Sequence, residues 1–237
     1  MDTPPDSPPP HPADSRLVHN FYDPADLPEQ VAASRRAAAA ARRVIAGLAA
    51  TRVDATTLDE VTASLERLAT VLEPHRPASR YSDTGGLHGG VGADAHVWES
   101  HPFIGPSHPL APPFVVRREG DHAVGHVTFG HVYEGPPGAV HGGVVAAMFD
   151  MVLGAATSVA QLAGLTGTLT VRYRKATPLD REIRYEAWVE RAEERKVRVA
   201  GVSTCDGELL AEGEAIFVRV DTRRYDAPDG TTKEQPA

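Results

Sequence analysis

The chain has 237 residues, of which 41% are hydrophobic, and this is enough for one sizeable domain with appendages. Its formal net charge of -8 disfavours a nucleic-acid partner, because binding to phosphates requires an excess of basic residues. A small substrate fits this charge balance better. Cys205 is the single cysteine and excludes an intramolecular disulfide, so we expect a protein of a reducing compartment, the cytoplasm.

The N-terminal third of the chain is expected to form a tail and a helical hairpin. Residues 1–24 are rich in proline and predict a disordered tail that does not resemble a secretory signal. Within residues 25–75, helix-favouring runs with apolar side chains at helical spacing predict helices over 27–52 and 57–72. Thr57 and Glu60 predict a capping box at the start of the second helix. The hairpin is expected to pack onto the main domain or onto a partner subunit.

The segment after the hairpin predicts no regular element. Residues 76–113 mix Gly, Pro, His and Ser and are expected to form an irregular linker. Its glycine-rich part lacks the lysine of a phosphate-binding loop. A His-Gly-Gly tripeptide at 88–90 is followed by no helical pattern, so it is given no role. Residues 222–237, at the other end, are expected to form a C-terminal tail.

The main domain is expected over residues 114–221, in the order strand, strand, helix and then four strands. Alternation of apolar and polar residues is clearest over 165–173, where Thr166 falls on the polar face and Leu169 on the apolar face. Glycine-containing turn signals at 120–121 and 206–207 predict hairpins. The predicted strands are 114–118, 122–129, 165–173, 183–189, 197–204 and 209–220. These patterns predict an α+β domain with an antiparallel sheet and one long buried helix.

The predicted helix over 144–162 lies in an apolar stretch that is long enough to cross a bilayer. Asp150 stands at its centre, where a carboxylate in hydrocarbon would be costly, so we interpret it as a buried helix rather than a membrane span. Gly142 and Gly143 precede the helix, directly after His141. Backbone N–H groups at a helix start lack intrahelical partners, and the helix dipole favours an anion or a developing oxyanion there.

Asp150 is the only ionisable residue between Val144 and Leu162, and Phe149 and Met151 flank it. A carboxylate among apolar neighbours has to be hydrogen-bonded or used in chemistry. One interpretation is an aspartate that satisfies a neighbouring backbone group. The other, which we favour, is a general base or nucleophile.

His141 and Asp150 cannot act on the same atom from one helix. Their spacing of nine residues corresponds to two and a half helical turns and about 13 Å along the axis, so they point to opposite sides. If both serve one reaction, the helix start of one subunit has to meet Asp150 of another. We therefore expect a homodimer or a dimer of dimers.

The spacing of three elements carries a resemblance to a known family. His141-Gly-Gly, Asp150 nine residues on, and Leu165-Thr-Gly-Thr-Leu-Thr-Val-Arg-Tyr-Arg-Lys-Ala-Thr-Pro-Leu179 resemble the PaaI-like acyl-CoA thioesterases of the hotdog superfamily, including members with an HGG motif. The resemblance implies a hotdog fold, in which a curled antiparallel sheet surrounds one long helix and two subunits form paired sites. It also implies hydrolysis of acyl-CoA to a free acid and CoA, which requires no cofactor or metal.

The same resemblance assigns roles to site residues. Asp150 would be the general base or nucleophile, and Thr166 would position the water or the carboxylate. The amides of Gly142 and Gly143 would form the oxyanion hole. His141 is expected to shape the turn rather than act as a base, because no nucleophile motif accompanies it.

Coenzyme A carries phosphates, so basic side chains are expected near the mouth of the site. The candidates are Arg172, Arg184, Arg195 and Lys196, and the alternative for each is an ordinary solvated charge. His122 and His126 can share a strand face, but nothing in the sequence supplies further ligands for zinc. Cys205 is expected to be a small core residue rather than a nucleophile.

A second class of function remains open. The chain could be a non-catalytic acyl-CoA-binding or sensing module whose N-terminal helices contact partners. The presence of both Asp150 and Thr166 favours the enzyme. A hotdog hydratase is disfavoured, because no Asp and His are paired at the spacing those enzymes use.

Overall fold

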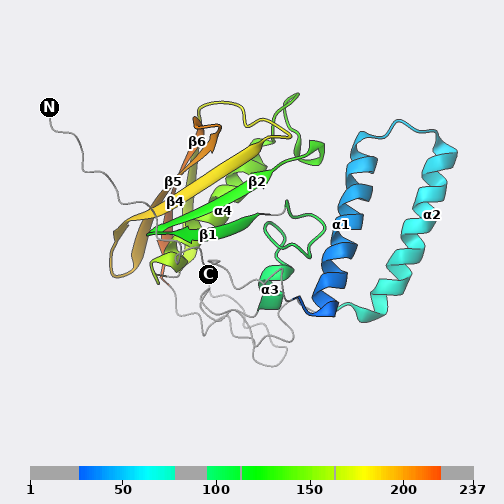
Figure 1. The fold of residues 1–237 in the computed structure, drawn as a ribbon, viewed down its shortest axis with the longest axis horizontal. Coiled ribbons are helices and arrows are strands. Elements are labelled where there is room, and N and C mark those ends of the chain that lie inside the picture. Colours follow the sequence, from blue (N-terminus) through cyan, green and yellow to red (C-terminus); the bar gives the residue numbers. More distant parts are fainter. Residues whose placement is uncertain (1–26, 78–94, 113, 163, 220–237) are drawn as a thin grey trace, which may run out of the picture.

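The computed structural model describes residues 27–77, 95–112, 114–162 and 164–219. The predicted tails at 1–24 and 222–237 and the tripeptide at 88–90 lie outside these ranges. Figure 1 shows a pair of N-terminal helices beside a sheet that packs on a long helix. The helices are α1 (Glu29–Ala50), α2 (Ala55–Leu72), α3 (Ala95–Glu99) and α4 (Gly142–Val159), with 3₁₀ turns η1 (Glu73–His75) and η2 (His131–Tyr133). The strands are β1 (Val115–Glu119), β2 (His122–Thr128), β3 (Leu165–Tyr173), β4 (Glu182–Ala192), β5 (Lys196–Cys205) and β6 (Glu208–Val218).

The six strands form one antiparallel sheet in the order β1-β2-β4-β5-β6-β3. Asp206 and Gly207 both have positive φ, at 48° and 79°, as a two-residue hairpin turn between β5 and β6 requires. The observed elements and their order confirm the predicted α+β fold with one long helix. Because β3 ends the sheet order, one of its edges has no strand partner in the part of the chain that the structure describes.

Helix α4 lies on one face of the sheet, contacts all six strands and forms the centre of the core (Figure 1). Phe149 and Leu153 are fully buried. The ring of Tyr185 on β4 packs edge-on against the rings of Phe149 and Phe114, with distances between ring centroids of 5.2 Å and 5.7 Å. Burial of side chains of this size contributes about 2 kcal/mol each. The buried residues of α4 pack on this face of the sheet and form the core with it.

By length and composition, α4 would also be long and apolar enough to cross a membrane. In this structure 44% of its residues are buried inside the protein. The predicted buried helix is thus found in the core, and a core helix passes the same test of composition as a membrane span.

Phe149 rests directly on the backbone of β6 at Gly213. A Cβ added at Gly213 would lie 2.4 Å from the Phe149 ring, which is closer than van der Waals contact allows. We expect Gly213→Ala to lower the free energy of unfolding by about 2 kcal/mol and Tm by about 6 °C in thermal unfolding. Gly154→Ala on α4 is the matched control, because its Cβ would meet Phe217 at an ordinary 3.7 Å. Equal Tm values for the two variants would contradict this packing.

Strand β3 departs from strict alternation at Gly167. Thr166 pairs with Phe217 of β6, whereas Thr168 pairs with Ile216, so Gly167 is the additional residue of a β-bulge. The predicted alternation puts Thr166 and Thr168 on the same outer face, and for Thr166 this is wrong. The bulge turns Thr166 to the face of the sheet that carries α4.

The N-terminal helices differ in how they pack. Val31 and Ala38 of α1 are buried. Helix α2 lies on the far side of α1 (Figure 1), has no buried residue, and leaves Leu68 60% exposed. The hairpin therefore contacts the main domain through α1. The apolar stripe of α2 is not covered by the described residues.

Two expectations for this region are corrected. The N-cap of α2 is Asp54, whose side chain accepts a hydrogen bond from the Thr57 N–H at 3.0 Å, so the capping box predicted at Thr57 is wrong. The helix begins earlier because the aspartate satisfies the amides of its first turn. Residues 95–112, within the expected linker 76–113, are folded against α1 and bury Val97, Ile104 and Ala111.

Candidate active site

His141 caps the start of α4. Its backbone is extended, with φ -60° and ψ 132°, and its Nδ1 accepts a hydrogen bond from the Gly143 N–H at 3.0 Å. A nitrogen that accepts a hydrogen bond carries no proton, so a neutral ring has its proton on Nε2. The imidazole therefore holds the turn that begins the helix.

The backbone amides of this turn are not equivalent. The His141 N–H donates to the Tyr133 C=O at 2.8 Å, and the Gly143 N–H is engaged by the His141 ring. The Gly142 N–H has no acceptor within the described ranges. Gly142 is the first residue of α4, where the helix dipole favours negative charge. In this conformation the Gly142 N–H is the amide free to bind an oxyanion, while the Gly143 N–H is shared with His141.

Tyr173, the last residue of β3, holds the other side of the turn. Its hydroxyl donates to the Gly142 C=O at 2.8 Å. A Cβ on Gly142 would lie 3.4 Å from this hydroxyl, so little room remains between them. Tyr173 was not among the predicted site residues. The signal was its position on the apolar face of the strand, the face that packs on the helix.

Asp150 lies in the middle of α4 and is paired with Thr166. The Thr166 Oγ1 donates to Asp150 Oδ1 at 2.8 Å. Asp150 is half-buried and Thr166 is exposed, so the carboxylate is open to solvent in the single chain rather than enclosed in the core. The hydroxyl fixes one carboxylate oxygen. Oδ2 remains available to accept a proton from water or to attack an electrophile.

The two parts of the candidate site lie at opposite ends of β3. Gly142 contacts Tyr173 at the end of the strand, whereas Asp150 contacts Thr166 at its beginning. Along the helix, Asp150 is about 13 Å from the capping residue and on the opposite side. The contacts within one chain therefore bring Asp150 and Thr166 together and leave Gly142 apart from them.

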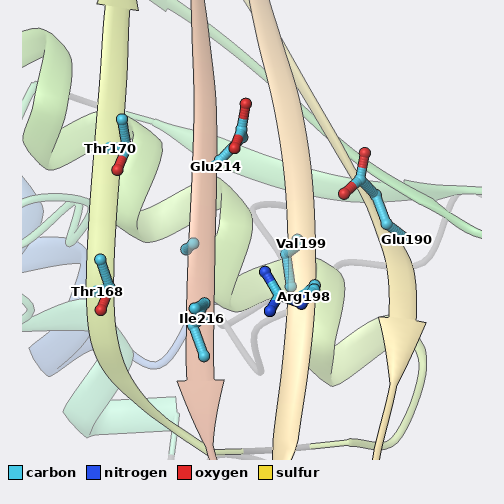
Figure 2. Close-up of a pocket in the computed structure, with 8 residues that line it drawn as sticks. Thr168, Thr170, Glu190, Arg198, Val199, Glu214 and Ile216 are labelled. Atoms are coloured by element: carbon cyan, nitrogen blue, oxygen red, sulfur yellow. The ribbon is translucent and has the colours of Figure 1, made fainter.

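Two of the four candidate CoA-binding residues are paired on the outer face of the sheet. Arg172 forms an ion pair with Glu214, and Arg184 forms one with Glu186. Figure 2 shows a shallow hollow on this face, to which Glu214 contributes. Its lining residues are Thr168, Thr170, Glu190, Arg198, Val199, Glu214, Ala215 and Ile216. The hollow is separated from Asp150 by the sheet, because α4 lies on the other face.

The other two candidates lie at the end of the sheet where β3 begins. Arg195 is in the turn between β4 and β5, and Lys196 is the first residue of β5. Lys196 pairs with Val218 of β6, which also pairs with Leu165 of β3. Arg195 and Lys196 are therefore at the same end of the sheet as Thr166, beside Glu193 and Glu194 of the same turn.

The remaining sequence candidates do not form a second site. His122 and His126 share the outer face of β2, but they pair with different carboxylates, Glu186 at 2.7 Å and Glu182 at 3.3 Å. Among the residues that the structure describes, no cluster of three His, Cys, Asp or Glu side chains is arranged to hold a metal. Cys205 is a buried free thiol in the core, 4% exposed.

Comparison with known proteins places this geometry in a family. The family model of the thioesterase superfamily matches residues 137–210. Acyl-coenzyme A thioesterase THEM4 from Xenopus laevis is 36% identical over 93 residues, which are 38% of this chain and 42% of that protein. The protein of the same name from Mus musculus is 28% identical over 93 residues, 38% of this chain and 40% of that protein. The chain thus spans less than half the length of these curated relatives.

A solved structure described as a thioesterase superfamily protein is similar over most of the chain. It is 30% identical, covers 87% of this chain and 97% of its own, and superposes with a TM-score of 0.72. The unmatched part of this chain is shorter than the hairpin of α1 and α2, so the similarity extends into the N-terminal helices. With this match, and with one long helix packed on a six-stranded antiparallel sheet, the chain belongs to the thioesterase superfamily and has the hotdog fold.

Proposed function

We propose that this chain hydrolyses acyl-CoA thioesters to a free carboxylic acid and CoA, at sites shared between two copies. The observation that carries the proposal is the Asp150–Thr166 pair, a solvent-accessible carboxylate in an otherwise apolar helix, oriented by a hydroxyl at 2.8 Å. A carboxylate held in this way is suited to act as a base or a nucleophile. The relatives named as acyl-coenzyme A thioesterases support the substrate class.

The open edge of β3 supports a shared site. If β3 pairs in antiparallel fashion with its copy around a twofold axis, the beginning of one strand lies opposite the end of the other. Thr166 of one protomer would then face the Tyr173 end of its partner, where the partner's Gly142 is held. This pairing would bring the free amide of one α4 to the Asp150 of the other. It would also satisfy the backbone groups of an exposed edge strand.

The chemistry follows from the free oxygen of Asp150. In one route Oδ2 takes a proton from water, the water oxygen attacks the thioester carbon, and the C–S bond breaks to release CoA. In the other route Oδ2 itself attacks that carbon, CoA leaves, and water hydrolyses the resulting anhydride. Both routes build negative charge on the carbonyl oxygen. A Gly142 N–H of the partner aimed at that oxygen would lower the barrier by about 3 kcal/mol.

Arg195 and Lys196 are the preferred candidates for the phosphates of CoA. They share the end of the sheet with Thr166, whereas Arg172 and Arg184 are engaged with glutamates on the outer face. Substrate entering from this end would place its phosphates near Arg195 and Lys196 and its thioester near Asp150. This arrangement needs no metal or cofactor.

A panel of acyl-CoA substrates of increasing chain length tests the proposal. The purified full chain is mixed with each substrate, and the released thiol is followed with a thiol-reactive chromophore. We expect catalytic release with at least one chain-length class and a dimer or larger assembly in light scattering. Binding of acyl-CoA without release would identify a non-catalytic binding module instead. Neither binding nor release would contradict both functions.

A further inference from the structure

The loop that leads into α4 closes tightly on His141. Glu134 and Val140 form an isolated antiparallel bridge, and the Gly138 N–H donates to the Glu134 side chain at 2.6 Å. A Cβ on Gly135 would lie 2.7 Å from the Cα of His141. Since the His141 N–H also donates to the Tyr133 C=O at 2.8 Å, the turn that presents Gly142 is tied to Tyr133.

Tyr133 is in turn tied to the folded segment 95–112. Its hydroxyl donates to the Leu110 C=O at 3.0 Å, and its ring packs edge-on against Phe129 at 5.8 Å. Burial raises the pKa of Tyr133, so the hydroxyl keeps its proton and remains a donor at neutral pH. The backbone of Tyr133 holds the turn, while its side chain holds the segment.

Arg42 of α1 also donates hydrogen bonds to the segment 95–112. Its Nη1 donates to the carbonyl oxygens of His108 at 2.8 Å and Pro106 at 3.3 Å. Two turns earlier on the helix, Arg35 pairs with Glu99 at 2.5 Å, and the Glu99 residue is only 1% exposed. Helix α1 also contacts η2, which contains Tyr133. The helix is therefore connected to the Gly142 turn through hydrogen bonds that are joined by the 106–110 backbone and by Tyr133.

We propose that helix α1 and the segment 95–112 hold the turn that presents the Gly142 amide to an oxyanion, and we call this arrangement the brace. Within the brace, Arg42 and Tyr133 fix the position of His141 and Gly142. Both are positioning residues, because they act through the 106–110 backbone and His141 rather than on the substrate. An oxyanion donor lowers the barrier only when it is held in place before charge develops. The catalytic consequence rests on the proposed function, whereas the mechanical link to the turn does not.

Kinetics of four variants, two single changes, their combination and a control, test the catalytic consequence. Tyr133→Phe removes the hydroxyl and keeps the ring, and Arg42→Met removes the donors and keeps the aliphatic stem. We expect each to lower kcat about tenfold with KM within about twofold, because the turn acts on the transition state. Arg43→Met, at the neighbouring exposed position of α1, is the matched control and should match the wild type. The double variant should be close to the single ones, because both act through one segment.

Hydrogen–deuterium exchange on the full chain tests the mechanical link without any substrate. Peptides spanning 133–145 should exchange faster in Tyr133→Phe and Arg42→Met than in Arg43→Met, while peptides from β5 and β6 stay unchanged. If this holds but the wild type releases no thiol, the brace stands and the proposed function fails. Unchanged exchange overturns the mechanical link, and faster exchange with unchanged kcat in an active enzyme overturns the catalytic consequence. If Arg42→Met does not fold, Tyr133→Phe decides, since it lacks only one oxygen.

Discussion

Asp150→Asn is expected to lower kcat for acyl-CoA hydrolysis at least about a thousandfold and to leave the fold unchanged. Asparagine has the same shape, and its amide oxygen still accepts the hydrogen bond from Thr166. It can neither take a proton from water at neutral pH nor form an anhydride. Released thiol under saturating substrate measures the effect, and thermal unfolding verifies that the variant is folded.

Two further variants make the test of Asp150 specific. Asp59→Asn, on the exposed α2, makes the same chemical change away from the sheet and should retain wild-type kcat. Thr166→Val keeps the volume but removes the donor to Oδ1, so kcat should fall about tenfold through loss of carboxylate orientation. Wild-type turnover by Asp150→Asn would remove the assigned role.

The parts of the fold that the sequence predicts are those set by local patterns. Strand β3 begins and ends at the predicted residues, and the turn at 206–207 has the positive φ values that its Asp-Gly signal requires. The long apolar run with Asp150 at its centre becomes α4 for the same reason. Its hydrophobicity on most sides indicates burial against a sheet, whichever strands surround it.

The orientation of Thr166 could not be derived from alternation, because it depends on pairing between strands. The bulge at Gly167 is defined by the register of β3 against β6, and these strands become neighbours only in the folded sheet. A glycine inside a strand is the available signal, since bulges often occur at such residues. The resemblance assigned Thr166 to the site, and the bulge explains how a residue of the polar pattern reaches Asp150.

Tertiary contacts also decide what sequence reasoning missed around Gly142. The engagement of the Gly143 N–H by His141 requires the extended conformation of His141, which the loop before α4 imposes. Tyr133 and Arg42 are far apart in sequence, and the fold brings them together on the segment 95–112, to which both donate hydrogen bonds. No spacing rule connects such residues, so residues 95–112 were predicted as part of a linker although they form a packed segment in the structure.

The amide of Gly142 can be removed while the helix is retained. Gly142 is the first residue of α4, a position where proline is tolerated, and His141 before it has the extended ψ of 132° that a residue preceding proline adopts. Gly142→Pro therefore deletes the N–H with little change of backbone, and kcat should fall about a hundredfold. Gly142→Ala keeps the N–H and adds a Cβ at 3.4 Å from Tyr173, so it controls for bulk.

Mixed dimers of Asp150→Asn and Gly142→Pro chains are expected to regain activity that neither variant has alone. If each site takes Asp150 from one chain and Gly142 from the other, a mixed dimer has one intact site and one with both groups changed. Random assortment makes half of the dimers mixed, so about a quarter of wild-type activity should return. Mixed dimers isolated with two affinity tags should reach about half. No recovery would contradict a site that combines Asp150 of one chain with Gly142 of the other.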